Sequence, residues 1–371
     1  MRVAQITHVF LPHVGGLELY VYRLARDLAN AQEEVDVLTT DMSTYHGWQK
    51  YDFNFNLTQY KANLTLLRNP FSWGLFKHLK DHDYDILHLH SMWFVPSIFA
   101  ALFKKNAKII MTVHGVYPDK LPWHQKLMVK LYKPFAKLIC RKTDTFIVLS
   151  DSEKEKLQKH FKVPDSKIKV VPNGFDYHEP ENSELADYMN MLELGHKILF
   201  TGRILPIKSP ELLIEAISKT QESFQIFFVG PINEKYKHEL MDLAHGRDVL
   251  NKLHFMGSFD PINQKDDLMA MYQAADLSVS IGQWEGLPTR IFESLYNGTP
   301  CVLYSPNNET FQDNVNCFKI NNLDSGELAS KLDEAMDKKK YDVVKNNGVE
   351  LANDFEWQKI FRQIYREYYK D

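Results

Sequence analysis

Apolar residues along the chain follow two alternating patterns. Short runs rich in β-branched and aromatic residues are typical of buried strands, and several longer stretches between them carry apolar residues at helical spacing. In the first half, strands are expected at 2–10, 34–40, 85–90, 108–115, 144–150 and 167–172. After Asn173-Gly174 the series restarts, with strands expected at 197–202, 225–230, 252–257, 276–280 and 300–304.

Strands that alternate with helices indicate parallel sheets with helices on both faces. The two series therefore predict an α/β protein of two Rossmann-like domains, one over 1–174 and one over 175–352, that meet at a cleft. A polar, acidic stretch near 174–195 is interpreted as the linker. The last residues, 353–371, carry apolar side chains at helical intervals and are interpreted as a closing helix that packs on a core.

Composition narrows the class of protein. Of the 371 residues, 44% are hydrophobic and 25% are charged, which excludes a disordered or collagen-like chain. The three cysteines form no Cys-x-x-Cys pair, so we expect neither a disulfide framework nor a sulfur-rich metal site. No apolar run reaches the roughly 18 residues that span a bilayer. The N-terminal run is interpreted as a strand rather than a signal peptide, and a reducing, cytoplasmic location fits.

Charge is unevenly distributed along the chain. Residues 1–180 carry 24 Lys or Arg against 18 Asp or Glu, a balance of +6, whereas the remainder carries 20 against 30, a balance of −10. A basic first half on an acidic protein suggests that this half meets an anionic partner. Nucleic acid, phospholipid and phosphorylated metabolites all qualify on charge alone.

Three segments follow expected strands and lead into expected helices, which is where α/β sheets bind ligands. In the first, Gly15 and Gly16 let the backbone approach a ligand, and the next helix offers unpaired N–H groups to an anion. A tight strand-to-helix turn without a ligand is the alternative. The lack of a complete Gly-x-Gly-x-x-Gly argues against a nicotinamide site.

The second segment follows the expected strand at 197–202. Arg203 and Lys208 lie in its loop, Ser209 is expected as an N-cap, and Pro210 is expected at the first helical position. Two cations beside a helix N-terminus suit a diphosphate. The alternative is two solvated charges in a loop.

The third segment contains a helix that is expected to begin near Pro288 and to end at Asn297-Gly298. The backbone N–H groups of Leu287 and Thr289 and of their neighbours then form a further anion cradle.

Two carboxylates belong to this segment. Glu285 lies in the loop and Glu293 about a turn and a half into the helix, so both can face one ligand from different depths. Carboxylates accept hydrogen bonds from hydroxyls, as sugar binding requires. A solvated helix charge is the alternative for Glu293, although its neighbours Phe292 and Leu295 are apolar.

The ordered set of motifs resembles glycosyltransferase family 4, whose retaining enzymes have the GT-B fold of two facing Rossmann-like domains. The motifs that carry the resemblance are Gly15-Gly16, 112–115 (Thr-Val-His-Gly), 171–174 (Val-Pro-Asn-Gly), Gly202-Arg203 with Lys208, and Glu285 with Glu293. In the family a closing helix crosses back to the N-terminal domain. The resemblance therefore implies that residues 353–371 pack on the N-terminal, acceptor-binding domain, and that residues 175–352 bind the nucleotide-sugar.

The resemblance also implies individual roles. Arg203 and Lys208 would neutralise the diphosphate of the donor and stabilise it as it leaves. Glu293 would hold the ribose hydroxyls, and Glu285 and His114 would contact the transferred sugar; for His114 a capped strand-end histidine is an equal alternative. Further donor contacts would come from Gly16, which lies against donor phosphate or acceptor, and from Gly286, Leu287 and Thr289. Met256-Gly257 would border the nucleobase.

The resemblance implies no metal and no cofactor, because fixed cations take the place of Mg²⁺ and the nucleotide-sugar, UDP- or GDP-linked, is a co-substrate. Asp83-Tyr84-Asp85 matches the letters of an Asp-x-Asp metal motif, but it opens a buried strand and is interpreted as a cap. Arg290 adds a charge beside the cradle. Contact with donor, contact with acceptor and exposure to solvent all stay open for it.

A basic amphipathic helix is expected within residues 104–142. Residues 104–142 hold ten Lys or Arg and one acid. Apolar residues form one helical stripe, namely Leu127, Met128, Leu131, Tyr132, Phe135, Leu138 and Ile139, and the adjacent stripe is Lys126, Lys130, Lys133, Lys137 and Arg141. Such a helix suits an anionic membrane surface, and a core-packed helix with a solvated basic face is the alternative. No nucleic-acid-binding motif is present, so we expect no nucleic-acid partner.

The sequence thus predicts a retaining, metal-independent glycosyltransferase that moves a sugar from a nucleotide-sugar to a hydroxyl of a glycan or lipid-linked acceptor. Its expected location is the cytoplasm, peripheral at the inner face of the plasma membrane. Two alternatives remain: a sugar-nucleotide epimerase of the same fold and a catalytically silent partner subunit.

Overall fold

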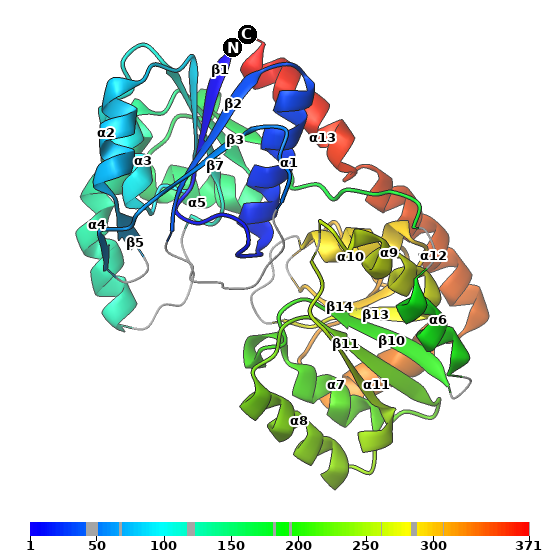
Figure 1. The fold of residues 1–371 in the computed structure, drawn as a ribbon. Helices are drawn as coiled ribbons and strands as arrows, with labels where there is room; N and C mark the ends of the chain where they lie inside the picture. The colour runs from blue at the N-terminus through cyan, green and yellow to red at the C-terminus, as the bar shows by residue number, and fades with distance from the viewer. Residues whose placement is uncertain are drawn as a thin grey trace. The chain divides into compact units, whose positions relative to one another are not determined.

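The computed structural model describes residues 1–41, 51–66, 69–116, 123–180, 183–192, 195–260, 262–282, 288–306 and 308–370, and only the backbone at 123–126 and 128. The chain divides into two compact units (Figure 1). The first consists of Met1–Asn173 and Ile360–Asp371, and the second of Gly174–Lys359.

The first unit is built on a seven-stranded sheet, all parallel, in the order β3-β2-β1-β6-β7-β8-β9. Its strands are β1 (Arg2–Ile6), β2 (Glu34–Thr40), β3 (Asn56–Tyr60), β6 (Ile86–His90), β7 (Lys108–Val113), β8 (Thr145–Val148) and β9 (Ile168–Val170). Its helices are α1 (Gly16–Asn30), α2 (Trp73–Asp81), α3 (Val95–Leu102), α4 (Trp123–Lys142) and α5 (Asp151–Phe161), with a short 3₁₀ turn, η1 (Asp165–Lys167), before β9. A small antiparallel pair, β4 (Leu64–Leu66) and β5 (Asn69–Phe71), lies outside this sheet.

The second unit repeats the scheme with six parallel strands in the order β12-β11-β10-β13-β14-β15. These are β10 (His196–Thr201), β11 (Phe224–Val229), β12 (Leu253–Gly257), β13 (Leu277–Ser280), β14 (Cys301–Tyr304) and β15 (Phe318–Ile320). Its helices are α6 (Glu184–Met191), α7 (Pro210–Ile217), α8 (Glu234–Gly246), α9 (Lys265–Ala274), α10 (Thr289–Tyr296), α11 (Ser325–Ala335) and α12 (Lys338–Asn353), with 3₁₀ turns η2 (Pro206–Lys208) and η3 (Leu250–Lys252).

Strand order fixes where each unit can bind a ligand. In the first unit the chain winds from β1 outward to β3 and then returns to β6 on the other side of β1. In the second unit it winds from β10 to β12 and returns to β13. Ligands of open α/β sheets bind at the carboxyl ends of the two strands that flank such a reversal. These ends belong to β1 and β6 in one unit and to β10 and β13 in the other.

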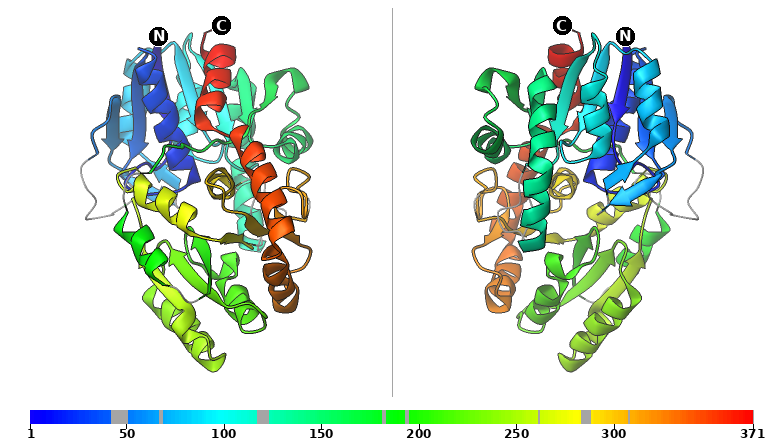
Figure 2. Two further views of the ribbon diagram at one scale, coloured as in Figure 1. Left: turned by 90° about the vertical axis from the view of Figure 1, so that its right-hand side faces the viewer. Right: turned by 90° about the vertical axis from the view of Figure 1, so that its left-hand side faces the viewer.

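The last residues of the chain pack on the first unit. Helix α13 (Trp357–Ile364) continues into a π-helical turn, η4 (Tyr365–Tyr369), which lies beside the N-terminal strand and α1 (Figure 2). The hydroxyl of Tyr365 donates to the Glu33 carboxylate at 2.6 Å, and the ammonium of Lys108 donates to the backbone carbonyl of Tyr368 at 3.0 Å. The start of α13 belongs to the second unit, since the amide of Trp357 donates to the carbonyl of Phe175.

Most expected strands form within a residue or two of their expected bounds, but β1 ends four residues early. Strands β3 and β15 were not expected, because β3 is an edge strand with polar residues and β15 is only three residues long. The expected linker is wrong: residues 174–195 belong to the second unit. Within them α6 forms, with Ser183 as its N-cap, and buries Met189 against α9.

Within the described residues, no helix has both the length and the apolar character that crossing a membrane requires.

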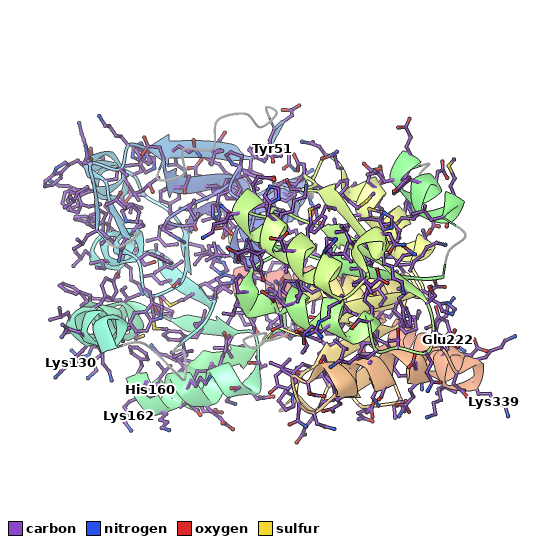
Figure 3. The ribbon with its side chains drawn as sticks, turned by 90° about the horizontal axis from the view of Figure 1, so that it is seen from below. Tyr51, Lys130, His160, Lys162, Glu222 and Lys339 are labelled. Atoms are coloured by element: carbon purple, nitrogen blue, oxygen red, sulfur yellow. The ribbon has the colours of Figure 1, made fainter. Side chains whose placement is uncertain are left out.

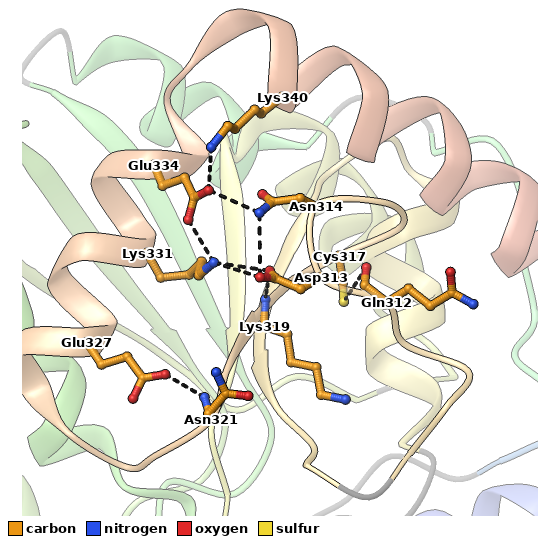
Figure 4. Close-up of polar contacts among 10 residues, drawn as sticks. All are labelled: Gln312, Asp313, Asn314, Cys317, Lys319, Asn321, Glu327, Lys331, Glu334 and Lys340. Atoms are coloured by element: carbon orange, nitrogen blue, oxygen red, sulfur yellow. Dashed lines mark hydrogen bonds and ion pairs between the residues drawn. The ribbon is translucent and has the colours of Figure 1, made fainter.

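A network of charged side chains ties the loop after β14 to α11 (Figure 4). The Lys331 ammonium lies 2.9 Å from the Asp313 carboxylate and 2.7 Å from the Glu334 carboxylate. Glu334 also pairs with Lys340 and accepts from the side-chain amide of Asn314. Burial alone would raise the pKa of Glu334, but the hydrogen bonds from Lys331 and Lys340 outweigh it and lower the pKa to about 2.

We predict that Lys331→Met lowers the free energy of unfolding by about 2 kcal/mol at pH 7, because the side chain is only 13% exposed and pairs with two carboxylates. The stabilising contribution of Glu334 is complete above its unfolded-state pKa near 4.5 and disappears as the pH falls through about 2. The difference between the variant and the wild type should therefore shrink over that range in denaturant titrations. Lys235→Met, which removes an exposed pair with Glu239, is the matched control and should cost less than about 0.5 kcal/mol.

Candidate functional site

Polar side chains gather at the carboxyl ends of β1, β6 and β7 in the first unit. Along β6, Leu87 and Leu89 pack in the core under α2–α5, so the alternation of a strand places His88 and His90 on the opposite face. His114 follows β7, and its Nε2 lies 3.3 Å from Nδ1 of His90. Its ring also meets the Tyr20 ring of α1 edge-on, with centroids 5.2 Å apart. The structure thus places His114 at the carboxyl-end edge of this sheet, next to the end of β6.

The start of α1 combines the two glycines with an acidic side chain. Gly15 is the N-cap, and a Cβ there would lie 2.5 Å from a carboxylate oxygen of Glu18, which folds back over the cap. Glu18 is buried and lies 3.3 Å from Nδ1 of His13. A Cβ on Gly16 would meet nothing within 4 Å, so open space adjoins this position. The carboxylate of Glu18 disfavours a second anion at this helix end.

In the second unit, two loops cross closely at the carboxyl ends of β10 and β11. Gly202 follows β10 with φ +104, and its amide donates to the carbonyl of Val229 at 2.9 Å. Gly230 has φ +145, and a Cβ there would lie 2.0 Å from the carbonyl oxygen of Gly202. Only glycine fits this crossing, which brings the chain to the loop that carries Arg203.

Arg290, which sequence reasoning left unassigned, lies over Gly202. A Cβ on Gly202 would be 2.8 Å from Nη1 of Arg290, and Nη2 donates to the Ser280 hydroxyl at 3.2 Å. The guanidinium of this half-buried residue therefore spans the ends of β10 and β13. Of the three alternatives for Arg290, a side chain that only points to solvent is thereby excluded.

The two predicted cations lie just before α7. Lys208 ends the short turn η2, and Pro210 occupies the first helical position as predicted. Ser209 is the N-cap residue, but its backbone is left-handed, with φ 55, and its side chain makes no capping bond. The predicted N-cap position is confirmed, although the cap is made without a side-chain hydrogen bond. Arg203 is exposed, and among the described residues it makes no ion pair or hydrogen bond.

Helix α10 begins at Thr289 after Pro288, and Gly298 beyond its end has φ +77, as the expected Gly stop requires. Glu293 is half-buried on this helix. Burial and the Glu293 carboxylate raise the pKa of Tyr272, whose hydroxyl lies 2.9 Å from that of Thr201 at the end of β10. Glu293 thus lies near the end of β10, and Thr289 is the first residue of the same helix. Glu285, Gly286 and Leu287 lie outside the described residues.

The Asp-x-Asp letters of 83–85 have structural partners. Asp85 accepts from the backbone amide of Arg2 at 2.7 Å, and Asp83 pairs with Lys105 at 2.8 Å. Tyr84 donates to Asp36 at 2.8 Å. These bonds join the start of β6 to β1 and β2.

Helix α4 exposes part of its apolar stripe. Leu127, Leu131 and Phe135 are 51%, 67% and 49% exposed, and Lys130 projects from the same helix (Figure 3). Contact with the core comes instead from Ala136, Ile139 and Cys140. The prediction that one stripe runs from Leu127 to Ile139 is wrong in this respect, because 127, 131 and 135 recur every four residues on the side away from the core. Lys137 and Arg141 are exposed, Lys133 is half-buried, and the side chain of Lys126 lies outside the described residues.

Sequence reasoning missed four residues of the first unit, namely Gln5, His88, His90 and Tyr369, whose hydroxyl accepts from the side-chain amide of Gln5 at 3.0 Å. One signal for Gln5 exists, since a glutamine in an otherwise apolar buried strand needs a partner. His88 and His90, two residues apart in a buried strand, are a similar signal. Tyr369 is separated from Gln5 by nearly the whole chain, and no local pattern connects them.

Family comparisons divide the chain in the same order as the fold. Residues 14–179 match the model described as Glycosyltransferase Family 4, and residues 193–350 match the model described as Glycosyl transferases group 1. Together the two models cover most of both units.

Individual relatives are distant but span most of the chain. The UDP-Gal:alpha-D-GlcNAc-diphosphoundecaprenol alpha-1,3-galactosyltransferase of Escherichia coli is 25% identical over 86% of this chain and 82% of its own length. The D-inositol 3-phosphate glycosyltransferase of Mycolicibacterium smegmatis is 22% identical over 92% of this chain and 83% of its own. Among solved structures, Anabaena HepE in complex with UDP and glucose superposes with a TM-score of 0.76 at 18% identity, over 99% of this chain and 98% of its own. The fold is therefore GT-B.

We predict that Gly202→Ala lowers the free energy of unfolding by about 1–3 kcal/mol, because alanine at φ +104 is strained and its Cβ meets Arg290. Adding Arg290→Ala should remove the part of this loss that comes from the contact between the new Cβ and Arg290, and should leave the part that comes from backbone strain. Gly246→Ala is the control, since its Cβ would meet nothing within 4 Å, and it should be neutral or stabilise by up to about 1 kcal/mol. An equal loss of stability for the Gly202 and Gly246 variants in thermal denaturation would contradict the predicted backbone strain at Gly202.

Proposed function

Because the chain belongs to glycosyltransferase family 4 and uses a nucleotide-sugar donor, we propose that it transfers the sugar with retention of configuration and without a metal ion. The acceptor we propose is a hydroxyl of a glycan or of a lipid-linked precursor. The observation that carries the proposal is the set of charged groups at the carboxyl ends of β10 and β13. Arg203 and Lys208 precede α7 there, and Glu293 lies on α10.

The cations suit a diphosphate. Arg203 has no ionic partner among the described residues, so its charge is available to a ligand. Lys208 lies directly before the start of α7, where the helix dipole adds partial positive charge. Such groups stabilise negative charge that develops on the leaving diphosphate, and they do so without reorganisation during the reaction.

The carboxylate of Glu293 suits the ribose of the donor. Glu293 is half-buried, and the two oxygens of a carboxylate can accept hydrogen bonds from two neighbouring hydroxyls. Tyr272 beside it stays protonated, because burial and Glu293 raise its pKa. We assign Thr289, Gly286 and Leu287 to the same donor site, and Glu285 to the transferred sugar.

In the first unit we assign His114 to a hydroxyl of the transferred sugar. Gly16 has open space beside it, and Glu18 disfavours a phosphate at the same helix end. We therefore assign Gly16 to the acceptor, the second of the two roles that the family resemblance allows.

Retention follows from attack on one face of the sugar. The acceptor oxygen forms its bond to the anomeric carbon on the side from which the diphosphate leaves, and an oxygen of the departing phosphate takes the hydroxyl proton. Arg203 and Lys208 would hold that phosphate in place for the transfer. As the first donor to test we propose a UDP-linked hexose, with a GDP-linked one as the alternative; UDP-Gal appears in the name of the Escherichia coli relative, and HepE was solved with UDP.

We also propose that α4 lies on an anionic lipid surface. Its exposed residues Leu127, Leu131 and Phe135 form an apolar stripe, and the helical spacing places Lys130, Lys137 and Arg141 along its edge. A lipid-linked acceptor would then be presented on that surface, at the cytoplasmic face of the membrane.

The reaction is tested with UDP-hexoses, a decaprenyl-diphosphate sugar as acceptor and excess EDTA. We expect nucleotide release only with acceptor present, undiminished by EDTA, and a product whose new linkage keeps the α configuration in its NMR spectrum. Conversion of the donor without acceptor would instead indicate an epimerase. A thermal-shift panel of UDP, GDP, ADP and dTDP that shows no binding would indicate a silent partner subunit. A β-linked product or loss of activity with EDTA would contradict retention or metal independence.

The roles of individual donor-site residues are tested with variants, by measuring UDP binding and turnover. Lys208→Ala and Glu293→Ala should each weaken UDP binding about tenfold, the scale of one charge-assisted hydrogen bond. Glu285→Ala should mainly lower turnover. Lys235→Ala and Glu239→Ala, an exposed pair on α8, are the matched controls and should leave binding unchanged. Unchanged UDP affinity in the first two variants would contradict their assignment.

Membrane association is tested by co-sedimentation with phosphatidylglycerol vesicles. A basic residue near an anionic surface contributes about 1 kcal/mol, so reversing Lys130, Lys137 and Arg141 to Glu should lower binding more than about 100-fold at low salt. Leu131→Asp should weaken it as well. Met191→Asp is the control, because Met191 is 76% exposed but lies on α6 of the second unit. Equal sedimentation of all variants, or none of the wild type, would contradict the proposal.

A further inference from the structure

Three histidines at the ligand-binding edge of the first unit are neutral at neutral pH. Burial lowers the pKa of His88 and of His114 to about 3, and it lowers that of His90 well below the ordinary value. A neutral imidazole carries its single N–H on either Nδ1 or Nε2, so one ring nitrogen donates and the other accepts. Which nitrogen of His114 accepts is therefore set by its neighbours.

Gln5 fixes the direction of hydrogen bonding toward His114. The side chain of Gln5 is fully buried, and its Oε1 lies 2.6 Å from Nε2 of His90. A carbonyl oxygen only accepts, so Nε2 of His90 carries the hydrogen and Nδ1 of His90 is an acceptor. That Nδ1 lies 3.3 Å from Nε2 of His114, which must then donate. The N–H of His114 is on Nε2, and its Nδ1 is left as an acceptor.

Tyr369 fixes the orientation of the Gln5 amide. Nε2 of Gln5 donates to the Tyr369 hydroxyl at 3.0 Å, and that hydroxyl is also hydrogen-bonded to Nδ1 of His88. Nε2 of His88 lies 2.7 Å from the Thr112 hydroxyl, which donates in turn to the hydroxyl of Tyr20 at 3.4 Å. The Tyr369 hydroxyl, fully buried, thus accepts from Gln5 and donates to His88.

We propose that Tyr369 and Gln5 are positioning residues, which hold His114 as the Nε2–H tautomer so that its Nδ1 accepts a hydrogen bond from a substrate hydroxyl. The inference rests on the proposed contact between His114 and the transferred sugar. Among the described residues, Nδ1 of His114 makes no hydrogen bond, so it is available for that contact. The last turn of the chain, separated from His114 by more than two hundred positions, thereby orients a group of the site.

Removing the Tyr369 hydroxyl removes the reason for this orientation. In Tyr369→Phe the amide of Gln5 has no acceptor for its N–H and turns, so that its nitrogen faces His90. Nε2 of His90 must then accept, its Nδ1 must donate, and Nε2 of His114 must accept. The N–H of His114 then moves to Nδ1, so that Nδ1 can no longer accept a hydrogen bond from the substrate hydroxyl.

The tautomer is measured directly by NMR of the full chain labelled with ¹⁵N-histidine. The His114 signals are identified by their loss in His114→Ala, and long-range ¹H–¹⁵N spectra show which ring nitrogen carries the hydrogen. We expect Nε2–H in the wild type and a shift toward Nδ1–H in Tyr369→Phe. Tyr365→Phe is the matched control, because it removes a hydroxyl from the same turn that donates to Glu33, and it should leave His114 unchanged.

Turnover separates positioning from a merely structural role. Tyr369→Phe should lower kcat about tenfold, the scale of one misdirected hydrogen bond, without changing UDP affinity. In the His114→Ala background, the same substitution should have no further effect on kcat. An equal additional loss of kcat in that background would overturn the proposal. A hydrogen on Nδ1 of His114 in the wild-type spectrum would also overturn it, and that measurement does not require Tyr369→Phe to fold. Full activity of His114→Ala would refute the sugar contact instead and leave the tautomer result standing.

Discussion

A parallel sheet that is covered on both faces contains no water to satisfy the polar side chains of its strands. Each such side chain must find its partner inside the protein, and this constraint organises the ligand-binding edge of the first unit. Gln5, His88, His90 and Thr112 lie on neighbouring strands, and their hydrogen bonds run among themselves and to Tyr369 and Tyr20. In each of these hydrogen bonds one group donates and the other accepts, and together the bonds determine which nitrogen of each histidine carries the hydrogen.

The same constraint is met differently in the second unit. Its strands also bury polar side chains, among them Thr201, Gln225 and Ser278, but its cations Arg203 and Lys208 lie in the loop beyond β10. Glycines at 202 and 230 let those loops cross, and Arg290 lies over the first of them. One edge is thus built from buried, neutral, directed hydrogen bonds, and the other from cations at helix starts. Neutral imidazoles suit hydroxyl groups, and exposed cations suit a diphosphate.

Sequence patterns predicted the order of strands and helices because buried parallel strands are continuous apolar runs and their loops carry Gly, Pro and charge. They also placed Arg203 and Lys208 between a strand end and a helix start, and Glu293 within a helix, since such positions depend on local sequence. They failed where tertiary contacts decide. The stretch at 174–195 is acidic overall, yet Ala186 and Met189 are enough to bury α6 against α9. The local sequence shows Arg290 as a charge beside the start of α10, but it gives no sign of its contact with Gly202, which lies nearly ninety positions away.

The chain terminus illustrates the limit best. Tyr365, Tyr368 and Tyr369 follow one another in an aromatic, helix-like pattern that predicts packing but does not distinguish them. The structure separates their roles by partner: Tyr365 bonds to Glu33, Tyr368 to its neighbour Glu367, and Tyr369 to Gln5 and His88. Of the three, only Tyr369 has its hydroxyl in a buried network that ends at the ligand-binding edge. A phenylalanine would fill nearly the same volume at each position. The buried hydroxyl of Tyr369, which is hydrogen-bonded to Gln5 and His88, is therefore explained by the hydrogen bonds that it orients rather than by packing.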